Sequence, residues 1–372
     1  MSASGADRGV AGGGELLGAE AGGRVGRRVP PVAGTDVVLT IDREIQAYTE
    51  QALRDAVTRY SAEAGSAVVL DARSGEVLAM VSLPTFDPGD IGAAGRDARR
   101  NRAVTDVYEP GSVNKVITAS AALEDGIVDL RQRFTVPDSY QIGSKRFSDS
   151  HSHATERMTL AEIMEQSSNI GTIKIAERVG ERRLYRYLRR FGYGQPTGLG
   201  FPGESGGLLT DPSQWWVTSL PTISIGQGVS ATLLQVASVF ATIAGGGEAV
   251  TPTLVRGTVG TGGRLEAAPA PARRPVVSSW TARILADMLV AVVEGEQGTC
   301  EACAVPGYTV GGKTGTAQKP SATSRGYEAG AYVGSFVGFA PAEDPDLVVG
   351  VMLDEPRPLY YGGLTAGPTF SD

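Results

Sequence analysis

Short apolar runs with β-strand character occur near both ends of the chain. Towards the beginning, two such runs flank a turn that ends in Gly75, which predicts a β-hairpin. Towards the end, the chain returns to short β-prone runs, which predict further strands. The predicted strands are Val37–Ile41, Ala67–Asp71, Glu76–Ser82, Tyr308–Gln318, Tyr332–Ala340 and Leu347–Asp354.

Between these ends, apolar residues recur with the helical period. A first helix is predicted at about Arg43–Tyr60, and Ser112 opens another that Gly126 ends. Thr159 and Glu162 have the spacing of a capping box, which marks a further helix start. Other helices are predicted at residues 170–179, 231–244 and 280–294. Strands from both ends with helices between them predict an α+β domain in which one mixed sheet is covered by helices.

Residues 1–34 differ in composition from the rest of the chain. They are rich in Gly, Ala and Arg and show no period, so we expect a flexible remnant of a preceding module. No apolar region of signal-peptide type follows the first residues, and no stretch reaches the roughly 18 apolar residues of a membrane span. Residues 35–372 are long enough to form one large domain with its own core.

Charge and lysine content narrow the function. The net charge of −7 argues against a nucleic-acid partner, because phosphate binding depends on clustered positive charge. A lysine can be tuned to lose its proton near neutral pH and an arginine cannot, so each lysine is a candidate for chemistry. Of the 34 basic residues only five are lysines, namely Lys115, Lys145, Lys174, Lys313 and Lys319.

Three local motifs match known patterns but lack the context that those patterns need. Residues 307–314 satisfy the phosphate-loop pattern, yet the residues after them do not favour the helix that would face a phosphate. Residues 203–207 match a Gly-x-Ser-x-Gly elbow, but the residues around them favour a turn over a strand and a helix. His151 and His153 lie in one polar loop, where solvation is favoured over metal binding. No metal and no cofactor are predicted.

The two cysteines, Cys300 and Cys303, form a single Cys-x-x-Cys motif. One such motif supplies too few ligands for a structural zinc site. The spacing leaves open a small local disulfide or two inert thiols, and a redox motif is the less favoured interpretation.

Three further motifs each lie in a predicted element that suits their chemistry. Ser112 and Lys115 are three residues apart at the start of a predicted helix, so both side chains lie on one helix face. The sequence Ser-Ser-Asn at residues 167–169 follows 55 residues later, between two helical segments. The sequence Lys-Thr-Gly-Thr at residues 313–316 follows after a further 146 residues, in a predicted strand. A helix-capping serine beside an exposed lysine would explain the first motif alone, but not the three together.

These motifs, Ser-x-x-Lys, Ser-x-Asn and Lys-Thr-Gly, resemble those of penicillin-binding proteins and serine β-lactamases. From about residue 35 to its end, the chain is most similar to the transpeptidase domain of class B penicillin-binding proteins of septal and sporulation type. The resemblance implies an α+β fold whose mixed, mainly antiparallel sheet is built from both chain ends and covered by helices on both faces. Further similar segments are Val37–Asp42 with Gln46, Thr85–Pro88, Tyr108–Gly111, Gly226–Gly228 and Gly311–Gln318.

The resemblance also implies the reaction. The activity would be that of a D,D-transpeptidase, which cross-links peptidoglycan through a serine acyl-enzyme and is inhibited by β-lactams. Ser112 would attack the carbonyl between two D-alanines of a stem peptide, with Lys115 as its base. Ser167 would relay a proton to the leaving amine, and Asn169 would hydrogen-bond the substrate backbone. Lys313 completes the set of expected catalytic residues.

The same resemblance assigns the substrate-binding groups. Thr314 and Thr316 would hold the terminal carboxylate of the substrate beside the charge of Lys313. Gly315 would leave room for the donor peptide to lie along the strand. The backbone N–H groups of Ser112 and Thr316 would form the oxyanion hole.

Location and partners follow from the resemblance as expectations. The chain would act on the extracytoplasmic face of a bacterial cell membrane, held by an N-terminal anchor absent from this sequence. Peptidoglycan stem peptides and β-lactams would bind it, and a polytopic glycan polymerase with other division or elongation proteins would be its partners.

Three features depart from the family pattern. The segment Ser230–Leu233 lacks an expected proline. Cys300 and Cys303 replace small or polar residues close to the Lys313 strand, where a disulfide would brace the edge of the site. The sequence ends at Asp372, where relatives continue into a closing C-terminal helix.

Other functions share these motifs. A β-lactamase or a β-lactam sensor has the same fold, although the sequence has no acidic segment of the kind that activates a deacylating water in class A β-lactamases. A carboxypeptidase differs only in using water as the acceptor. A non-catalytic cell-wall scaffold would keep the fold without needing every motif residue, and all of them are present here.

Overall fold

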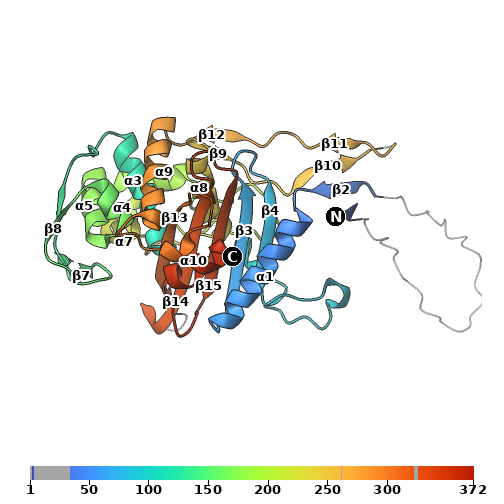
Figure 1. Ribbon diagram of the computed structural model, residues 1–372, viewed down its shortest axis with the longest axis horizontal. Coiled ribbons are helices and arrows are strands. Elements are labelled where there is room, and N and C mark those ends of the chain that lie inside the picture. The colour runs from blue at the N-terminus through green and yellow to red at the C-terminus, as the bar shows by residue number, and fades with distance from the viewer. Residues whose placement is uncertain (1, 4–33, 261, 322–325) are drawn as a thin grey trace, which may run out of the picture. The chain divides into compact units, whose positions relative to one another are not determined.

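The chain divides into two compact units, which are described separately. One unit consists of Met1–Thr40 and Val255–Ala270, and the other of Ile41–Leu254 and Pro271–Asp372. The prediction for residues 1–34 falls almost entirely outside the described residues. The structure, a computed structural model, describes residues 2–3, 34–260, 262–321 and 326–372 (Figure 1).

The smaller unit is an antiparallel sheet with the strand order β1-β2-β10-β11. The predicted strand at Val37–Ile41 corresponds to β2, and its partner β10 was not predicted from the sequence. The strands are β1 (Ser2–Ala3), β2 (Asp36–Leu39), β10 (Val255–Val259) and β11 (Leu265–Ala267).

The larger unit is built around a five-stranded sheet with the order β13-β14-β15-β3-β4. Each strand is antiparallel to its neighbours, so the predicted mixed sheet is antiparallel throughout. The two ends of the chain meet where β15 pairs with β3, as the sequence predicted. The strands are β3 (Ala64–Asp71), β4 (Val77–Leu83), β13 (Gly311–Pro320), β14 (Tyr327–Ala340) and β15 (Leu347–Asp354).

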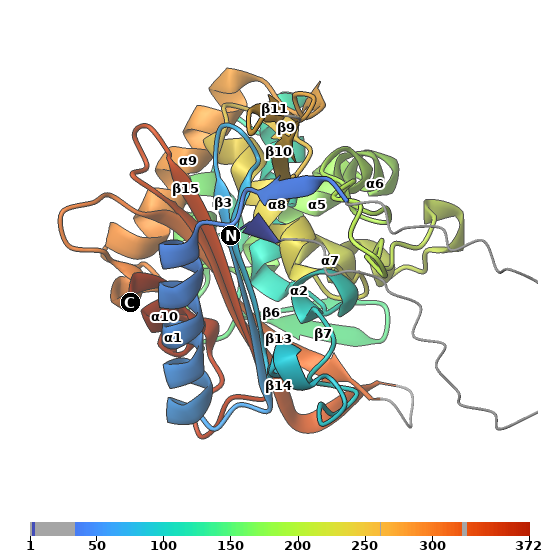
Figure 2. The same cartoon turned by 90° about the vertical axis from the view of Figure 1, so that its right-hand side faces the viewer.

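Successive apolar side chains of these strands point to opposite faces of the sheet. On one face, Phe336 belongs to a core formed with α1 (Arg43–Arg59) and α10 (Ala366–Ser371). Its neighbour Val337 belongs to the larger core on the other face, where α8 (Leu233–Ala244) covers the sheet. Figure 2 shows α1 and α10 on one side of the sheet and α8 on the other. The sheet is thus buried on both faces.

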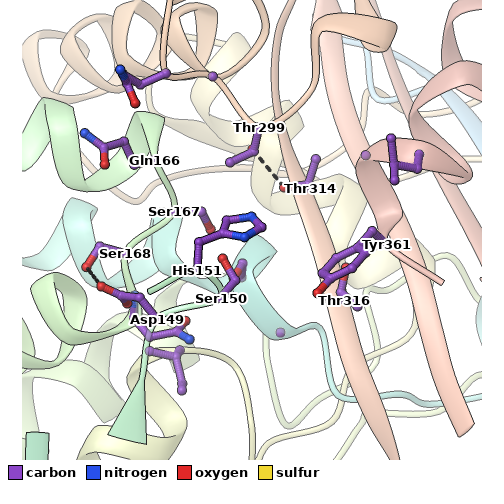
Figure 3. A pocket seen from close by; sticks show the side chains of 18 of the residues that line it. Asp149, Ser150, His151, Gln166, Ser167, Ser168, Thr299, Thr314, Thr316 and Tyr361 are labelled. Carbon is purple, nitrogen blue, oxygen red and sulfur yellow. Dashed lines mark hydrogen bonds between the residues drawn. The ribbon is translucent and has the colours of Figure 1, made fainter. Parts of the chain in front are cut away.

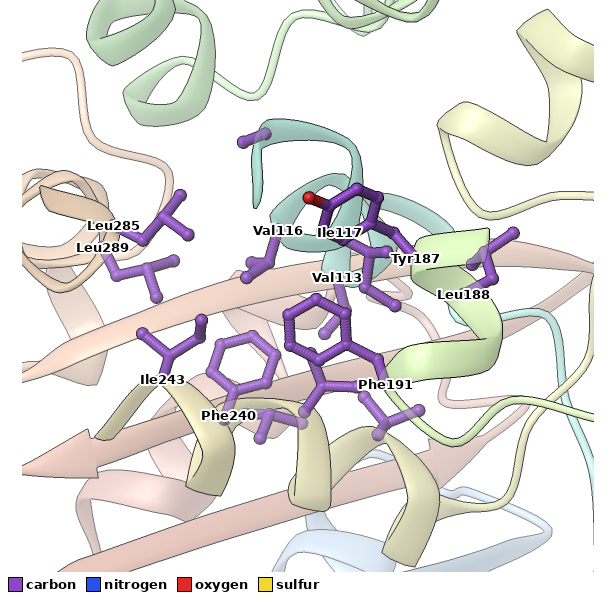
Figure 4. Packing of buried hydrophobic residues seen from close by; sticks show 14 of the residues in the cluster. Val113, Val116, Ile117, Tyr187, Leu188, Phe191, Phe240, Ile243, Leu285 and Leu289 are labelled. Atoms are coloured by element: carbon purple, nitrogen blue, oxygen red, sulfur yellow. The ribbon is translucent and has the colours of Figure 1, made fainter. Parts of the chain in front are cut away.

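The segment between the sheet ends forms a second helical layer on the larger core. Figure 4 shows Val116 and Ile117 of α3 among apolar side chains of α6, α8 and α9. The remaining helices are α2 (Arg102–Thr105), α3 (Lys115–Glu124), α4 (Leu160–Glu165), α5 (Asn169–Val179), α6 (Glu181–Arg190), α7 (Ser219–Ser224) and α9 (Ser279–Glu294). Three antiparallel strand pairs complete the unit: β5 (Phe134–Val136) with β8 (Glu156–Met158), β6 (Ser139–Ile142) with β7 (Lys145–Ser148), and β9 (Glu248–Val250) with β12 (Arg273–Pro275).

Helix ends follow the local signals in the sequence. Thr159 and Glu162 form the predicted capping box of α4, and Gly180 caps the C-terminus of α5. Two starts differ from the prediction. Ser112 lies in a 3-10 turn that leads into α3, and β13 begins later than expected because Val305–Tyr308 forms a tight turn. No helix among the described residues is long and apolar enough to cross a membrane.

The crossing of α4 and α5 leaves no space for a side chain at Gly171. A Cβ atom there would lie 2.6 Å from Ile163 Cγ1. We expect Gly171→Ala to lower the free energy of unfolding by about 1–3 kcal/mol, because overpacking pushes the two helices apart. Urea unfolding measures this loss.

Gly95→Ala is the control, because a Cβ at Gly95 would meet no atom within 4 Å. When Ile163→Ala is added to Gly171→Ala, the combined loss should be smaller than the sum of the two single losses, because the smaller side chain makes room for the Cβ. Equal stability of Gly171→Ala and the wild type would contradict the assigned packing.

Candidate active site

The three sequence motifs meet at one cleft (Figure 3). The cleft has a volume of about 880 Å³, and its lining includes Ser112, residues 167–169, Thr314 and Thr316. Figure 3 shows Ser167 on one wall, opposite Thr314 and Thr316. Residues far apart in the sequence therefore face a common space, as the motif order predicted.

Ser112 lies in the Ser112 turn, which we define as Gly111–Asn114. Two hydrogen bonds hold this turn: its first N–H donates to the Gly226 carbonyl at 3.0 Å, and Asn114 Nδ2 donates to the Ile223 carbonyl at 2.8 Å. The Ser112 side chain is partly exposed, and among the described residues its hydroxyl has no hydrogen-bond partner. The hydroxyl can therefore meet a molecule that enters the cleft.

The segment Gly226–Gly228 lies directly under the Ser112 turn. A Cβ at Gly226 would lie 2.0 Å from the Gly111 carbonyl oxygen, and Gly226 has a φ of +80°. Both facts require glycine there, because other residues rarely adopt this φ and the two backbones touch. Glu109 strengthens the contact by accepting a hydrogen bond from the Gly228 N–H at 2.8 Å.

Lys115 is fully buried behind the Ser112 turn. Its Nζ donates to the Ser167 carbonyl at 2.5 Å and to Asn169 Oδ1 at 2.7 Å, and lies 3.3 Å from Ser167 Oγ. Burial lowers the pKa of Lys115 to about 7, although the charge of Asp149 acts in the opposite direction. A large fraction of Lys115 is therefore neutral at physiological pH.

The Ser-Ser-Asn sequence forms a sharp turn between α4 and α5. Ser167 has a φ of +58°, and Ser168 caps α5 by accepting a hydrogen bond from the Gly171 N–H at 2.9 Å. Asn169 is held at both ends of its carboxamide, since Nδ2 donates to the Ser148 carbonyl at 3.0 Å while Oδ1 accepts from Lys115. The turn thus presents three oxygens to one amine.

The opposite wall is β13, an edge strand of the sheet. Thr314 and Thr316 line the cleft, whereas Lys313 between the walls is fully buried. Burial lowers the pKa of Lys313 well below its usual value, and repulsion from Lys115 adds to this effect. The Thr314 and Thr299 hydroxyl oxygens are 3.0 Å apart, and Thr316 Oγ1 accepts a hydrogen bond from the Gly362 N–H at 3.0 Å.

The packing behind β13 leaves no space for a side chain at Gly315. A Cβ at Gly315 would lie 2.3 Å from Ser335 Oγ, 2.7 Å from Val113 Cγ2 and 2.8 Å from the Pro110 carbonyl oxygen. These atoms lie behind the strand, and Gly315 does not line the cleft. Close packing behind β13 therefore requires glycine here, and the room for a donor peptide stays a prediction.

Several residues of the site were not singled out in the sequence. Asp149 accepts hydrogen bonds from Ser168 Oγ at 2.8 Å and from the Ile170 N–H at 3.0 Å. It lies about twenty residues before the turn that it contacts, so no local spacing signals it. A row of stacked rings also lines the cleft, with centroid separations of 4.2 Å for Tyr332 and Tyr360 and 4.6 Å for Tyr360 and Tyr361.

The two histidines differ in their surroundings. His151 is exposed at the cleft, as expected for a solvated loop. His153 is not simply solvated, because its Nε2 lies 3.1 Å from Asp149 Oδ2 and its Nδ1 2.6 Å from the Ala154 carbonyl oxygen. In the described part of the chain, no group of three or more His, Cys, Asp or Glu side chains is arranged to hold a metal ion.

The other local motifs have the structures that their context predicted. Residues 307–314 pass from a turn into β13 and not into a helix, and residues 203–207 form a turn. Cys300 and Cys303 are joined by a disulfide, which resolves the two alternatives left by their spacing. This disulfide directly follows Thr299, the residue that contacts Thr314.

Comparisons with known proteins agree with this geometry. Residues 65–372 match the family described as "Penicillin binding protein transpeptidase domain". The chain is 41% identical over 349 residues to the penicillin-binding protein PbpB of Mycolicibacterium smegmatis, covering 92% of this chain and 54% of that protein. It is 38% identical over 348 residues to the probable peptidoglycan D,D-transpeptidase PenA of Neisseria flavescens, covering 93% of this chain and 83% of that sequence.

A solved structure is similar over the same region. The crystal structure of penicillin-binding protein 3 of Mycobacterium tuberculosis, complexed with aztreonam, superposes with a TM-score of 0.88 at 42% identity. The match covers 93% of this chain and 79% of that one. This chain belongs to the penicillin-binding protein transpeptidase domain family, and its relatives place it with the class B proteins. It spans about half the length of the PbpB relatives.

The burial of Lys115 makes the stability of the chain depend on pH. Its pKa is about 7 in the folded chain, compared with about 10.4 in an unfolded one. At a pH between these two pKa values, Lys115 is protonated in the unfolded chain and largely neutral in the folded one. The free energy of unfolding should therefore rise with pH, by at most about 1.4 kcal/mol per pH unit from this group.

Urea unfolding between roughly pH 7 and pH 9.5 measures this slope. Lys115→Met removes the contribution, so its slope should be smaller than that of the wild type. Lys319→Met is the matched control: burial lowers the pKa of Lys319, but hydrogen bonds to Asp354 and Glu355 outweigh it and the net shift is upward. Identical slopes for Lys115→Met and the wild type would contradict the burial of a neutral amine.

Proposed function

We propose that this chain is the transpeptidase domain of a peptidoglycan D,D-transpeptidase, which cross-links stem peptides through a serine acyl-enzyme. One observation carries the proposal: Ser112, whose hydroxyl has no hydrogen-bond partner in the described part of the chain, lines the cleft three residues before a buried Lys115 whose pKa is about 7. A hydroxyl needs a base to become a nucleophile at neutral pH, and a neutral amine is such a base. The relative PenA is named a probable peptidoglycan D,D-transpeptidase, which supports the same reaction.

In the first step, Ser112 Oγ attacks the carbonyl carbon between the last two D-alanines of a stem peptide. Lys115 accepts the Oγ proton as the new C–O bond forms. The peptide C–N bond then breaks, and Ser167, within hydrogen-bond reach of Lys115, relays a proton to the leaving D-alanine amine. The backbone N–H groups of Ser112 and Thr316 stabilise the oxyanion, at roughly 3 kcal/mol per donor.

The β13 wall binds the donor peptide. An extended peptide can add to this edge strand as a further strand, while Asn169 bonds its backbone from the opposite wall. The hydroxyl groups of Thr314 and Thr316 hold the terminal carboxylate. The arriving negative charge favours the protonated form of Lys313, which in turn disfavours a proton on Lys115. Substrate binding thus prepares the base.

In the second step, the amine of another stem peptide attacks the ester carbonyl of the acyl-enzyme. Lys115, neutral again after the first step, accepts a proton from the attacking amine as the new C–N bond forms. It returns this proton to Ser112 Oγ as the ester C–O bond breaks. A β-lactam acylates Ser112 by the same geometry, and the acyl-enzyme persists when no acceptor amine displaces it. The aztreonam complex of the Mycobacterium tuberculosis relative supports β-lactam binding.

The transpeptidase domains of this family act outside the cytoplasm, and we infer the same location for this chain, held at the cell membrane by an anchor outside the given sequence. The proposed partners are a polytopic glycan polymerase and other division or elongation proteins. The name of the relative Stage V sporulation protein D is compatible with a sporulation role.

Covalent labelling by a fluorescent penicillin tests the nucleophile. We expect stoichiometric labelling of the chain, observed on a denaturing gel and by intact mass, and no labelling of Ser112→Ala. Ser205→Ala, in the rejected elbow motif, is the matched control and should label like the wild type. Unlabelled wild-type chain would overturn the proposal, and rapid turnover of the penicillin would favour a β-lactamase instead.

The rate of this labelling should depend on pH through Lys115. Only the neutral amine accepts the Ser112 proton, so the acylation rate should fall about tenfold per pH unit below pH 7 and level off above it. Lys115→Arg should be inactive at every pH, because a guanidinium does not lose its proton. A flat profile between roughly pH 5.5 and pH 8.5 would contradict the assigned base.

A further inference from the structure

One buried carboxylate holds the turn that faces Lys115. Asp149 follows β7, and its side chain is only 8% exposed. Its Oδ1 accepts hydrogen bonds from the backbone N–H groups of Asn169 and Ile170, and its Oδ2 accepts one from Ser168 Oγ. Three successive residues at the start of α5 are thus bonded to a single side chain from another element.

The turn needs such support because its backbone is strained. Ser167 has a φ of +58°, a conformation that non-glycine residues adopt at a cost of about 1–3 kcal/mol. Such a conformation persists only when the surroundings hold it. The Ser168 hydroxyl is fixed on both sides, since it donates to Asp149 at 2.8 Å and accepts from the Gly171 N–H at 2.9 Å.

His153 in turn fixes the carboxylate. Its Nε2 lies 3.1 Å from Asp149 Oδ2, and its Nδ1 lies 2.6 Å from the Ala154 carbonyl oxygen. Both neighbours are acceptors, so the ring satisfies both contacts only when both nitrogens carry protons. The pKa of His153 is accordingly raised, first by the Ala154 carbonyl and then by Asp149.

We propose that Asp149 is a positioning residue of this active site: supported by His153, it holds the Ser167–Asn169 turn against Lys115 and supplies the negative charge that this lysine faces. The hydrogen bonds alone show that Asp149 holds the turn, whereas its effect on catalysis rests on the proposed function. Asp149 acts through Lys115, because both oxygens closest to the lysine Nζ belong to the turn that Asp149 holds.

Charged groups on several elements lie around Lys115. Burial lowers the pKa of Lys115, and among charged groups Asp149 acts to raise it. Lys313 on β13 repels Lys115 across the site, and His153 and Glu156 lie beyond Asp149 with 4.0 Å between His153 Nδ1 and Glu156 Oε1. Removing the charge of Asp149 should therefore lower the pKa of Lys115, and the loss of the proton on His153 that accompanies it offsets only part of this effect.

Asp149→Asn separates the charge from the hydrogen bonds. The asparagine Oδ1 still accepts from both backbone N–H groups at the start of α5. Its Nδ2 donates to Ser168 Oγ and to the Nε2 of a neutral His153. Asp149→Ala removes the charge and all of these bonds. Comparing the two variants distinguishes an electrostatic effect from loss of the turn.

The first readout is the titration of Lys115, followed by NMR with ¹³C-labelled lysine in the full chain. With only five lysines, the spectrum is simple enough to assign from Lys→Arg variants. We expect the Lys115 midpoint to move down by about one pH unit in Asp149→Asn. Asp42→Asn is the matched control, because Asp42 caps α1 by accepting from Glu44 N–H at 2.9 Å and Ile45 N–H at 3.0 Å, away from the cleft.

The second readout is hydrogen exchange at the amides of Asn169 and Ile170. Exchange should accelerate about tenfold or more in Asp149→Ala, which leaves both N–H groups without their acceptor, and change little in Asp149→Asn. Asp149→Ser replaces the alanine variant if that variant does not fold. An unshifted Lys115 midpoint in Asp149→Asn, or unchanged exchange in the truncated variant, would overturn the proposal.

The third readout is acylation by penicillin as a function of pH. In Asp149→Asn the acid limb of the rate profile should move to lower pH by the same amount as the Lys115 midpoint. In Asp149→Ala the limiting rate should also fall, by about ten- to a hundredfold, because the turn is no longer held. If the wild-type chain is not acylated, the proposed function fails, whereas NMR and exchange still decide the role of Asp149.

Discussion

Two lysine amines buried behind one cleft form the constraint on which the rest of the site depends. Taking an ammonium out of water costs several kcal/mol unless acceptors or a counter-charge replace the solvent. The protein meets this cost unequally: Lys115 has the oxygens of the Ser167–Asn169 turn and faces Asp149, whereas Lys313 has only the Thr314 hydroxyl, 3.4 Å away, among the described residues. The two amines therefore compete for one positive charge. In the proposed mechanism, an anion that binds at Thr314 and Thr316 changes that competition, and this would link substrate recognition to the activation of Ser112.

The architecture holds these amines on separate elements that cannot drift apart. Lys313 belongs to an edge strand of a sheet buried on both faces, and Lys115 belongs to a helix that packs on the larger core. β13 contacts the segment that leads into α3 at Gly315, where there is no space for a Cβ atom between the strand and Val113 or Pro110. A sheet made from both chain ends thus supplies one wall of the cleft, while the helical segment between those ends supplies the other.

Much of this arrangement was predictable because its signals are local. The apolar run of Leu347–Asp354 and the capping box at Thr159 each reside in a few neighbouring residues, and both elements are present as predicted. The motif residues could be nominated as a site because the chemistry predicted for them requires fixed spacings. Asp149 was missed because its partners lie about twenty residues away, and no spacing rule connects a loop carboxylate with a helix that starts elsewhere. The close packing behind Gly315 was also missed, because the sequence does not show which face of a strand meets another part of the chain.

The contact between Gly226 and Gly111 has a consequence for how such a site evolves. The Ser112 turn rests on another segment backbone to backbone, with no side chain between them whose size could change in small steps. Almost any replacement at Gly226 displaces the proposed nucleophile Ser112 abruptly, so we do not expect gradual adaptation to begin there. The wall formed by Tyr332, Tyr360 and Tyr361 is made of side chains, which can be trimmed or exchanged one group at a time. Variation in ligand preference within this scaffold should therefore accumulate on the aromatic wall, while the floor of the cleft stays fixed.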